Sequence, residues 1–137
     1  MIEKSPRTRE QVRAATAHEL ISKVKTETGA KEFGRQCLRL PALIHQCGLC
    51  QALAFLETKK TGNVSVVESL AQVVSAPEHD LDGAKLAQKA REVGMVEYQW
   101  LSREALKSAQ WLKRYAEAVL KVKPGDTGED STAGGGK

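Results

Sequence analysis

The sequence predicts an all-α protein: a single compact helical bundle of five to seven helices with a disordered C-terminal tail. Apolar residues recur at helical spacing through most of the chain, and no segment has a convincing strand pattern. Residues 40–56 form a stretch of 17 residues without a formal charge, although charged residues make up 28% of the chain. Residues 122–137 are rich in glycine and poor in apolar side chains, which is typical of disorder. We therefore expect a helical-bundle domain over residues 1–121 and a tail over residues 122–137.

The first helix is expected near the start of the chain. Ser5 is a good N-cap and Pro6 suits the first helical position, because the missing N–H of proline has no helical partner there. Gly29 is the expected C-terminal stop. Arg9 and Arg13, four residues apart, border the apolar stripe of this helix. The ordinary explanation is an ion pair, or side chains that extend from the core edge to solvent; the alternative is a cationic edge directed at a ligand or a neighbouring subunit.

The uncharged stretch at residues 40–56 is expected to form the buried axis of the bundle. It is shorter than the ~20 apolar residues of a membrane span and contains His45 and two glutamines, so no membrane segment is expected. A helix that starts near Lys31 should be disturbed just before Pro41, because the residue before a proline is driven away from the α conformation. Gly48 marks a kink or a close helix–helix approach, and a turn is expected at residues 61–63.

Two shorter helices are expected between this axis and the last helix. Ser65, followed three residues later by Glu68, is a capping-box pattern and predicts a helix to about Val74. A loop covers residues 75–80, and helical spacing returns from about Asp82 until Gly94.

The last helix, capped by Ser102, is the most clearly amphipathic segment. The aromatic side chains near and within it are expected in the core, which argues against an aromatic platform for stacked bases. Four cations fall in one narrow ribbon on the opposite face, where a solvated surface is the ordinary explanation and a phosphate-binding surface the alternative. The aromatic residues are Tyr98, Trp100, Trp111 and Tyr115, and the cations are Arg103, Lys107, Arg114 and Lys121.

His45, Cys47 and Cys50 form the motif that most resembles a chemical site. A Cys-x-x-Cys pair near a histidine is half of a zinc site or a redox dithiol. A second ligand pair is missing, with only Cys37 left to join, and a redox motif would be expected after a strand. The favoured interpretation is inert core thiols, with a zinc site and redox chemistry as alternatives.

Nothing else in the sequence predicts catalysis. The histidines are scattered, no carboxylate pair has a telling spacing and no glycine loop could bind phosphate, so we expect a protein that is not an enzyme and needs no metal or cofactor. The net charge of +4 is concentrated in residues 1–60, where 11 basic residues stand against 6 acidic ones; such an imbalance can attract polyphosphates. The start lacks the apolar core of a signal peptide, and three cysteines suit a reducing compartment, so a cytoplasmic location is expected.

Three segments, in order along the chain, resemble one known family. They are residues 7–15 (RTREQVRAA), 40–56 (LPALIHQCGLCQALAFL) and 102–117 (SREAL…WLKRYAE). Together they resemble the small all-helical subunit of the type III-B CRISPR effector, the fifth-named component of the Cmr complex, over roughly residues 7–121. The family pattern has Asn and Gly where this chain has Cys47 and Cys50, which further indicates that the Cys-x-x-Cys pair is incidental.

The resemblance implies a role without catalysis. Such subunits stack as copies in a minor filament beside the guide-RNA-bearing subunits and help hold the guide–target RNA duplex. The partners it implies are other Cmr subunits, copies of this chain, and guide and target RNA through phosphate contacts. Matching the motifs residue by residue, and adding the arginine one helical turn before Arg39, gives the residues expected to contact RNA or a subunit. They are Arg9, Arg13, Arg35, Arg39, Lys113 and Arg114.

Two other functions remain open at this point. One is a free-standing helical adaptor that binds a protein partner through the last helix and never meets RNA. The other is a small thiol-redox or zinc protein that uses Cys47 and Cys50.

Overall fold

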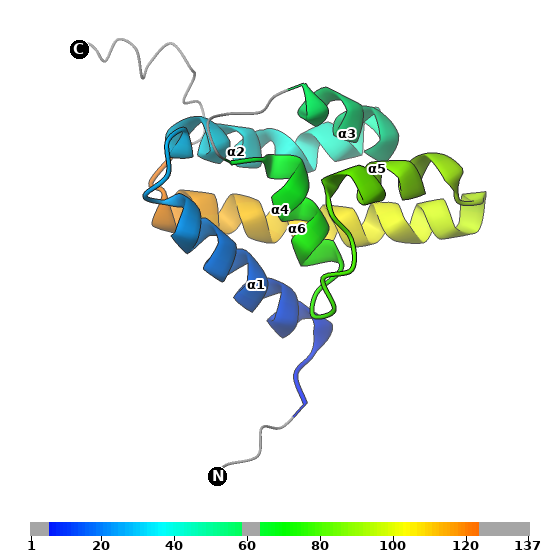
Figure 1. Ribbon diagram of the computed structural model, residues 1–137, viewed down its shortest axis with the longest axis horizontal. Helices are drawn as coiled ribbons and strands as arrows, with labels where there is room; N and C mark the ends of the chain where they lie inside the picture. Colours follow the sequence, from blue (N-terminus) through cyan, green and yellow to red (C-terminus); the bar gives the residue numbers. More distant parts are fainter. Residues whose placement is uncertain (1–5, 59–63, 124–137) are drawn as a thin grey trace.

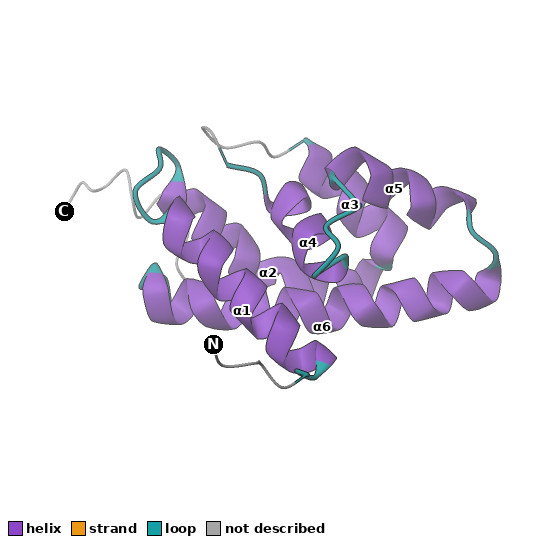
Figure 2. Ribbon diagram, turned by 60° about the horizontal axis from the view of Figure 1, so that its bottom comes forward, coloured by secondary structure: helices purple, strands orange, loops and turns teal. Residues whose placement is uncertain are grey.

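The computed structural model describes residues 6–58 and 64–123. Over these ranges the chain contains six helices and no strand element, which confirms the all-α prediction and the expected number of helices. Figure 1 shows their arrangement, and in Figure 2 the described residues are coloured as helices and loops. In chain order they are α1 Arg9–Val24, α2 Ala30–Cys47, α3 Leu49–Glu57, α4 Val66–Val74, α5 Gly83–Glu92 and α6 Met95–Val119.

Helix α6 is the element on which most of the others assemble. It packs against α2 over much of its length and also contacts α1 and α4 (Figure 1). Its buried face consists of small and aliphatic side chains, and small side chains let neighbouring helices approach closely. The hydrophobic residues of this face are Leu101, Ala105, Ala109, Leu112 and Ala116, each 0% or 1% exposed. The centre of the bundle is therefore the α2–α6 pair.

The uncharged stretch does not form a single axis. Helix α2 continues without interruption through Pro41, so the disturbance expected just before the proline is wrong. Leu40 and Ile44, on either side of Pro41, are 0% and 5% exposed, and their packing outweighs the hydrogen bond that proline cannot make. The break comes at Gly48, whose φ of 87° favours glycine, and it divides the stretch between α2 and α3.

The first helix also has different ends from those predicted. Helix α1 begins at Arg9, where Thr8 and Gln11 form a capping box, and not at Pro6. It ends at Val24, several residues before the expected stop. Gly29, with a φ of 90°, precedes α2 instead of terminating α1.

The last helix is longer than predicted. Helix α6 begins at Met95, directly after Gly94, so Ser102 lies inside the helix and does not cap it. Tyr98 and Leu101 pack against the core and hold the additional turns in place. In the part of the chain that the structure describes, the buried Oγ of Ser102 has no hydrogen-bond partner.

The middle of the chain largely follows the prediction. Ser65 caps α4 by accepting a hydrogen bond from the Glu68 N–H, and Asp82 caps α5 in the same way. The turn expected at residues 61–63 and the predicted tail beyond residue 123 lie outside the described residues. Val122, which was assigned to the tail, is 2% exposed and lies against Gly34, so the packed body extends at least one residue past the predicted boundary. No described helix is both long and apolar enough to cross a membrane.

Candidate functional site

Arg9, Arg13 and Glu104 join α1 to α6. The Arg9 guanidinium donates a hydrogen bond to Oε1 of Glu104 over 2.7 Å, and Arg13 pairs with the same oxygen. The side chains of Arg13 and Glu104 are 7% and 8% exposed, whereas that of Arg9 is 66% exposed. Arg13 therefore belongs to an internal ion pair, and Arg9 is the solvent-facing member of the cluster.

The buried ion pair gives Arg13 a structural role. Burial, and then the positive charge of Arg9, lowers the pKa of Arg13, but the ordinary pKa of arginine is so high that the side chain stays charged. A buried guanidinium without a carboxylate is strongly unfavourable, so Glu104 is what stabilises Arg13 inside the bundle. Of the two residues expected to make contacts from α1, only Arg9 is open to a partner.

A cleft of about 580 Å³ lies between α1 and α6 beside this ion pair, and we refer to it as the tryptophan cleft because both tryptophans of the chain line it. The guanidinium carbon of Arg9 lies 5.6 Å from the ring centroid of Trp100. Trp111 stacks on Tyr115 with 5.8 Å between ring centroids. The lining residues are Arg9, Glu10, Arg13, Trp100, Glu104, Lys107, Gln110 and Trp111.

Trp100 departs from the prediction that the aromatic side chains are core. It is 41% exposed, while Tyr98, Trp111 and Tyr115 are partly buried and pack against the core. The sequence predicts that the last helix begins at Ser102, after Trp100. In the longer helix, Trp100 lies at the edge of the exposed face and can meet a ligand.

Arg103, Lys107 and Arg114 form an exposed row of cations on α6, which we refer to as the α6 ribbon. The row is about 16 Å long by the rise of an α-helix. None of the three forms an ion pair within residues 6–58 and 64–123. Lys121, the fourth predicted member, lies beyond the helix with a φ of 63°. The α6 ribbon therefore carries positive charge that no described carboxylate neutralises.

The remaining residues expected to make contacts lie on α2 and α6. Arg35 is 8% exposed and donates through Nε to Glu32 over 3.0 Å, whereas Arg39, one turn later, is exposed. Lys113 and Arg114 line a second hollow at the junction of α6 with α2. The structure therefore places Lys113 with Arg114, but it does not gather the six expected residues into one site. The other residues that line this hollow are Pro41, Gln110 and Glu117.

The three cysteines occupy different environments. Cys37 is buried, and burial raises the pKa of its thiol far above the ordinary range. Cys50 is half-buried and donates from Sγ to the Ala90 carbonyl over 3.3 Å. Cys47 is exposed at the end of α2, so the prediction of core thiols is wrong for this residue. Among the described residues, no group of three or more His, Cys, Asp or Glu side chains is arranged to hold a metal ion.

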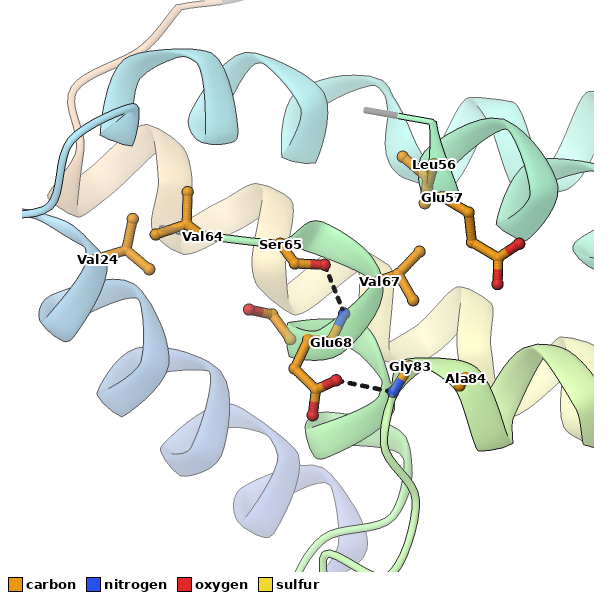
Figure 3. Close-up of a pocket in the computed structure, with 10 residues that line it drawn as sticks. Val24, Leu56, Glu57, Val64, Ser65, Val67, Glu68, Gly83 and Ala84 are labelled. Carbon is orange, nitrogen blue, oxygen red and sulfur yellow. Dashed lines mark hydrogen bonds between the residues drawn. The ribbon is translucent and has the colours of Figure 1, made fainter. Parts of the chain in front are cut away.

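A third hollow lies among the ends of α1 and α3 and the starts of α4 and α5 (Figure 3). Val24 and Leu56 contribute apolar walls. The Ser65 hydroxyl accepts a hydrogen bond from the Glu68 N–H over 3.2 Å, and the Glu68 carboxylate accepts one from the Gly83 N–H over 2.9 Å (Figure 3). Glu68 thus ties α4 to α5 and does not complete the predicted capping box. The two hydrogen bonds drawn in this hollow serve helix ends.

Sequence reasoning missed Glu104 and Trp100, and it left Arg103 and Lys107 out of the residues expected to make contacts. The partnership of Glu104 with Arg9 spans 95 residues of chain, which no local pattern reveals. The ribbon was visible in the helical spacing of its cations. The structure adds that these cations are exposed and without a described carboxylate partner, which distinguishes them from Arg13.

Comparisons with known proteins point to one family. The model of a family described as CRISPR-associated protein (Cas_Cmr5) matches residues 9–119. The CRISPR system Cmr subunit Cmr5 of Thermus thermophilus is 38% identical over 115 residues, which cover 83% of this chain and 97% of that protein. The crystal structure of a CRISPR-associated Cmr5 family protein from Thermus thermophilus is similar with a TM-score of 0.76 and 37% identity. That match covers 84% of this chain and 99% of the other.

Proposed function

This chain belongs to the Cmr5 family of CRISPR-associated proteins, which confirms the resemblance found in its sequence, and from this premise we propose that it is a non-catalytic structural subunit of a Cmr ribonucleoprotein. In this role it stacks with copies of itself and with other Cmr subunits in the minor filament of the complex. It also helps hold the guide–target RNA duplex during antiviral defence in the cytoplasm.

The α6 ribbon is the observation that carries the RNA part of this proposal. An exposed cation without a carboxylate partner can bind an incoming phosphate directly. A cation that is already paired must first break its existing interaction. Arg103, Lys107 and Arg114 meet this condition within the described residues. Contacts of this kind are independent of base sequence and weaken as salt rises.

The six residues expected to make contacts divide into two groups under this proposal. Arg9, Arg39 and Arg114 are exposed and Lys113 is half-buried, so each can reach RNA or a neighbouring subunit directly. Arg13 and Arg35 are buried and paired with carboxylates, so they contribute by holding helices in place. Arg103 and Lys107 join the first group.

The start of α6 supports the assembly part of the proposal. Met95 and Val96 are 73% and 79% exposed. Adjacent exposed apolar side chains favour contact with another protein. Because these residues lie near the α6 ribbon, one helix can serve both a subunit and RNA.

Co-purification tests the proposal directly. A tagged copy of the chain, expressed in its native host, should retain several unlike Cmr subunits and bound small RNA. A triple variant, Arg103→Ala with Lys107→Ala and Arg114→Ala, should retain less RNA at moderate salt. The matched control is Lys25→Ala with Lys85→Ala and Arg91→Ala, which removes three exposed cations from other surfaces and should behave as the unmodified chain.

Two results would contradict the proposal. Purification of the chain without RNA or other Cmr subunits would favour the free-standing adaptor. Equal RNA retention by the ribbon variant and its matched control would show that the α6 ribbon does not contact RNA.

A further inference from the structure

The tryptophan cleft has features that phosphate contact alone does not explain. Building on the proposed function, we propose that this cleft binds an unpaired base of single-stranded RNA, which stacks against Trp100 while the flanking phosphates lie on the α6 ribbon. The ligand class is thus a single-stranded polyribonucleotide, recognised by base stacking and by charge.

The indole rings of the chain meet at this cleft. The chain has only two tryptophans, and both line the cleft. Trp100 is 41% exposed, so part of its large aromatic ring is accessible to a ligand. Stacking on an exposed aromatic side chain is the usual way in which proteins hold unpaired bases.

The other groups in the cleft suit a nucleotide. The volume of about 580 Å³ lies within the range of about 300–1,000 Å³ that is typical of small-ligand pockets. Arg9 lies over Trp100, and an arginine guanidinium provides a second flat surface on which a base can stack. The Gln110 amide, also in the lining, can both donate and accept a hydrogen bond at a base edge.

Charge decides on which side of Trp100 the base binds. Trp100 and Arg9 also line a smaller hollow of about 220 Å³, whose lining includes Glu78 and Asp80. Lys89 also lines this hollow but pairs with Glu97, so the exposed carboxylates of Glu78 and Asp80 still repel the phosphates that accompany a base. In the tryptophan cleft, Arg9, Arg13 and Lys107 stand against Glu10 and Glu104, and Glu104 is already paired with both arginines, so the lining carries a net positive charge.

A continuous path leads from the cleft along α6. Gln110 lines both the tryptophan cleft and the hollow that contains Lys113 and Arg114. From Trp100 to Arg114 the path is about 21 Å long by the rise of the helix. A single strand can therefore place a base at Trp100 and lead its phosphates past Lys107 towards Arg114.

The cleft favours a single strand over a duplex. The bases of an RNA duplex are stacked on one another. The Trp100 ring, which lies between α1 and α6, therefore cannot reach the face of a paired base unless the RNA duplex opens. The α6 ribbon alone makes no such distinction, because both forms of RNA present phosphates. Preference for unpaired RNA is therefore the property that separates this inference from simple charge attraction.

Tryptophan fluorescence of the full chain provides the test, because both reporting residues lie in the cleft. Titration with an unstructured 12-nucleotide oligoadenylate should quench the fluorescence, and the same strand paired with oligouridylate should quench it much less. Trp100→Ala should weaken binding of the single strand about tenfold, as expected for the loss of one stacked base. Trp100→Leu, which keeps apolar bulk without an aromatic face, should cause a similar loss, and Trp100→Phe should recover most of the affinity. Binding by these variants is followed by anisotropy of a labelled strand, and circular dichroism confirms that they fold.

Phe55→Ala is the matched control, because it removes another exposed aromatic side chain, 46% exposed on α3; it should leave the affinity unchanged. Equal binding of single strand by Trp100→Ala and the unmodified chain, preference for the duplex, or no binding at all would overturn the inference. If the α6 ribbon variant loses RNA while Trp100→Ala does not, the proposed function stands and the base site fails. If the ribbon variant also binds normally, the phosphate contacts of the proposed function fail too.

Discussion

The α1–α6 seam and the uncharged stretch shared by α2 and α3 stabilise the bundle in opposite ways. At the seam, the buried Arg13 is compensated by Glu104, and a polar cleft lies beside the pair. In the uncharged stretch, Leu40, Leu49 and Leu53 are 0%, 0% and 1% exposed and pack with other apolar side chains. The seam thus combines the buried apolar residues of α1, such as Ala17 and Ile21, with one ion pair between distant residues, whereas the stretch depends mainly on apolar packing.

This difference shows how to separate structural cations from those that serve a partner. Arg9 and Arg13 look equivalent in the sequence, four residues apart at the edge of one stripe. In the structure they differ about ninefold in exposure, at 66% and 7%. Both arginines pair with Glu104, so exposure, rather than residue type or pairing, decides which of the two remains available to bind RNA.

The largest effect is expected from breaking the seam. Glu104→Ala should lower the free energy of unfolding by about 3–5 kcal/mol, because it leaves the Arg13 guanidinium buried without its carboxylate. Chemical denaturation followed by circular dichroism measures the change. Arg13→Met combined with Glu104→Leu should recover much of the loss, since apolar residues can replace a buried ion pair. A loss below ~1 kcal/mol for Glu104→Ala would show that the pair does not hold the seam.

In the uncharged stretch, stability should depend on the volume of the buried apolar side chains. Leu53→Ala should cost about 2–5 kcal/mol, because the buried side chain leaves a cavity that its neighbours fill only in part. Cys50→Ala should cost much less, because that side chain is smaller and half-buried. The same denaturation experiment compares the two, and an equal cost for both variants would contradict this account of the packing.

The exposed member of the seam should matter far less than the buried ones. Arg9→Ala removes an exposed ion pair and a cation–π contact, which together are worth about 1 kcal/mol. Thermal unfolding of the Arg9→Ala and Arg13→Ala variants provides the comparison, and Arg13→Ala should show the larger fall in Tm. Similar falls for both variants would mean that the two arginines share one structural role.

The three cysteines should react with a thiol reagent at different rates. In the native protein at pH 8, a disulfide reagent should label Cys47 rapidly and Cys50 more slowly, while Cys37 should react only after unfolding. The reason is that Cys37 is buried, and burial raises the pKa of its thiol so that little thiolate forms. Mass spectrometry of the labelled peptides identifies each thiol. Rapid native labelling of Cys37 would show that this part of α2 opens readily.

Much of the fold follows from local sequence, and the exceptions have identifiable physical causes. The helical spacing predicts the all-α class, and Ser65 and Asp82 mark the starts of α4 and α5 correctly. Pro41 misleads because packing of the residues around it outweighs its local preference. At the start of α1, Ser5 with Pro6 and Thr8 with Gln11 are competing start signals, and the reciprocal hydrogen bonds of Thr8 and Gln11 set the start of the helix.

The candidate site was less accessible to sequence reasoning. The α6 ribbon could be read from helical spacing, because that property belongs to a single element. The pairing of Arg13 with Glu104, and the tryptophan cleft between α1 and α6, depend on how distant helices pack. Trp100 in particular acquires its place at the edge of the ribbon only once α6 is extended back to Met95.

The salt dependence of target-RNA binding by the reconstituted complex tests the central claim most directly. Each cation of the α6 ribbon should release about one counterion when it binds a phosphate. Replacing Arg103, Lys107 and Arg114 by alanine should therefore reduce the slope of log affinity against log salt by about 2 to 3 for each copy of the chain that contacts RNA. The control that removes Lys25, Lys85 and Arg91 should leave the slope unchanged. A ribbon variant with the same slope as this control would contradict the claim that the exposed cations of α6 bind RNA.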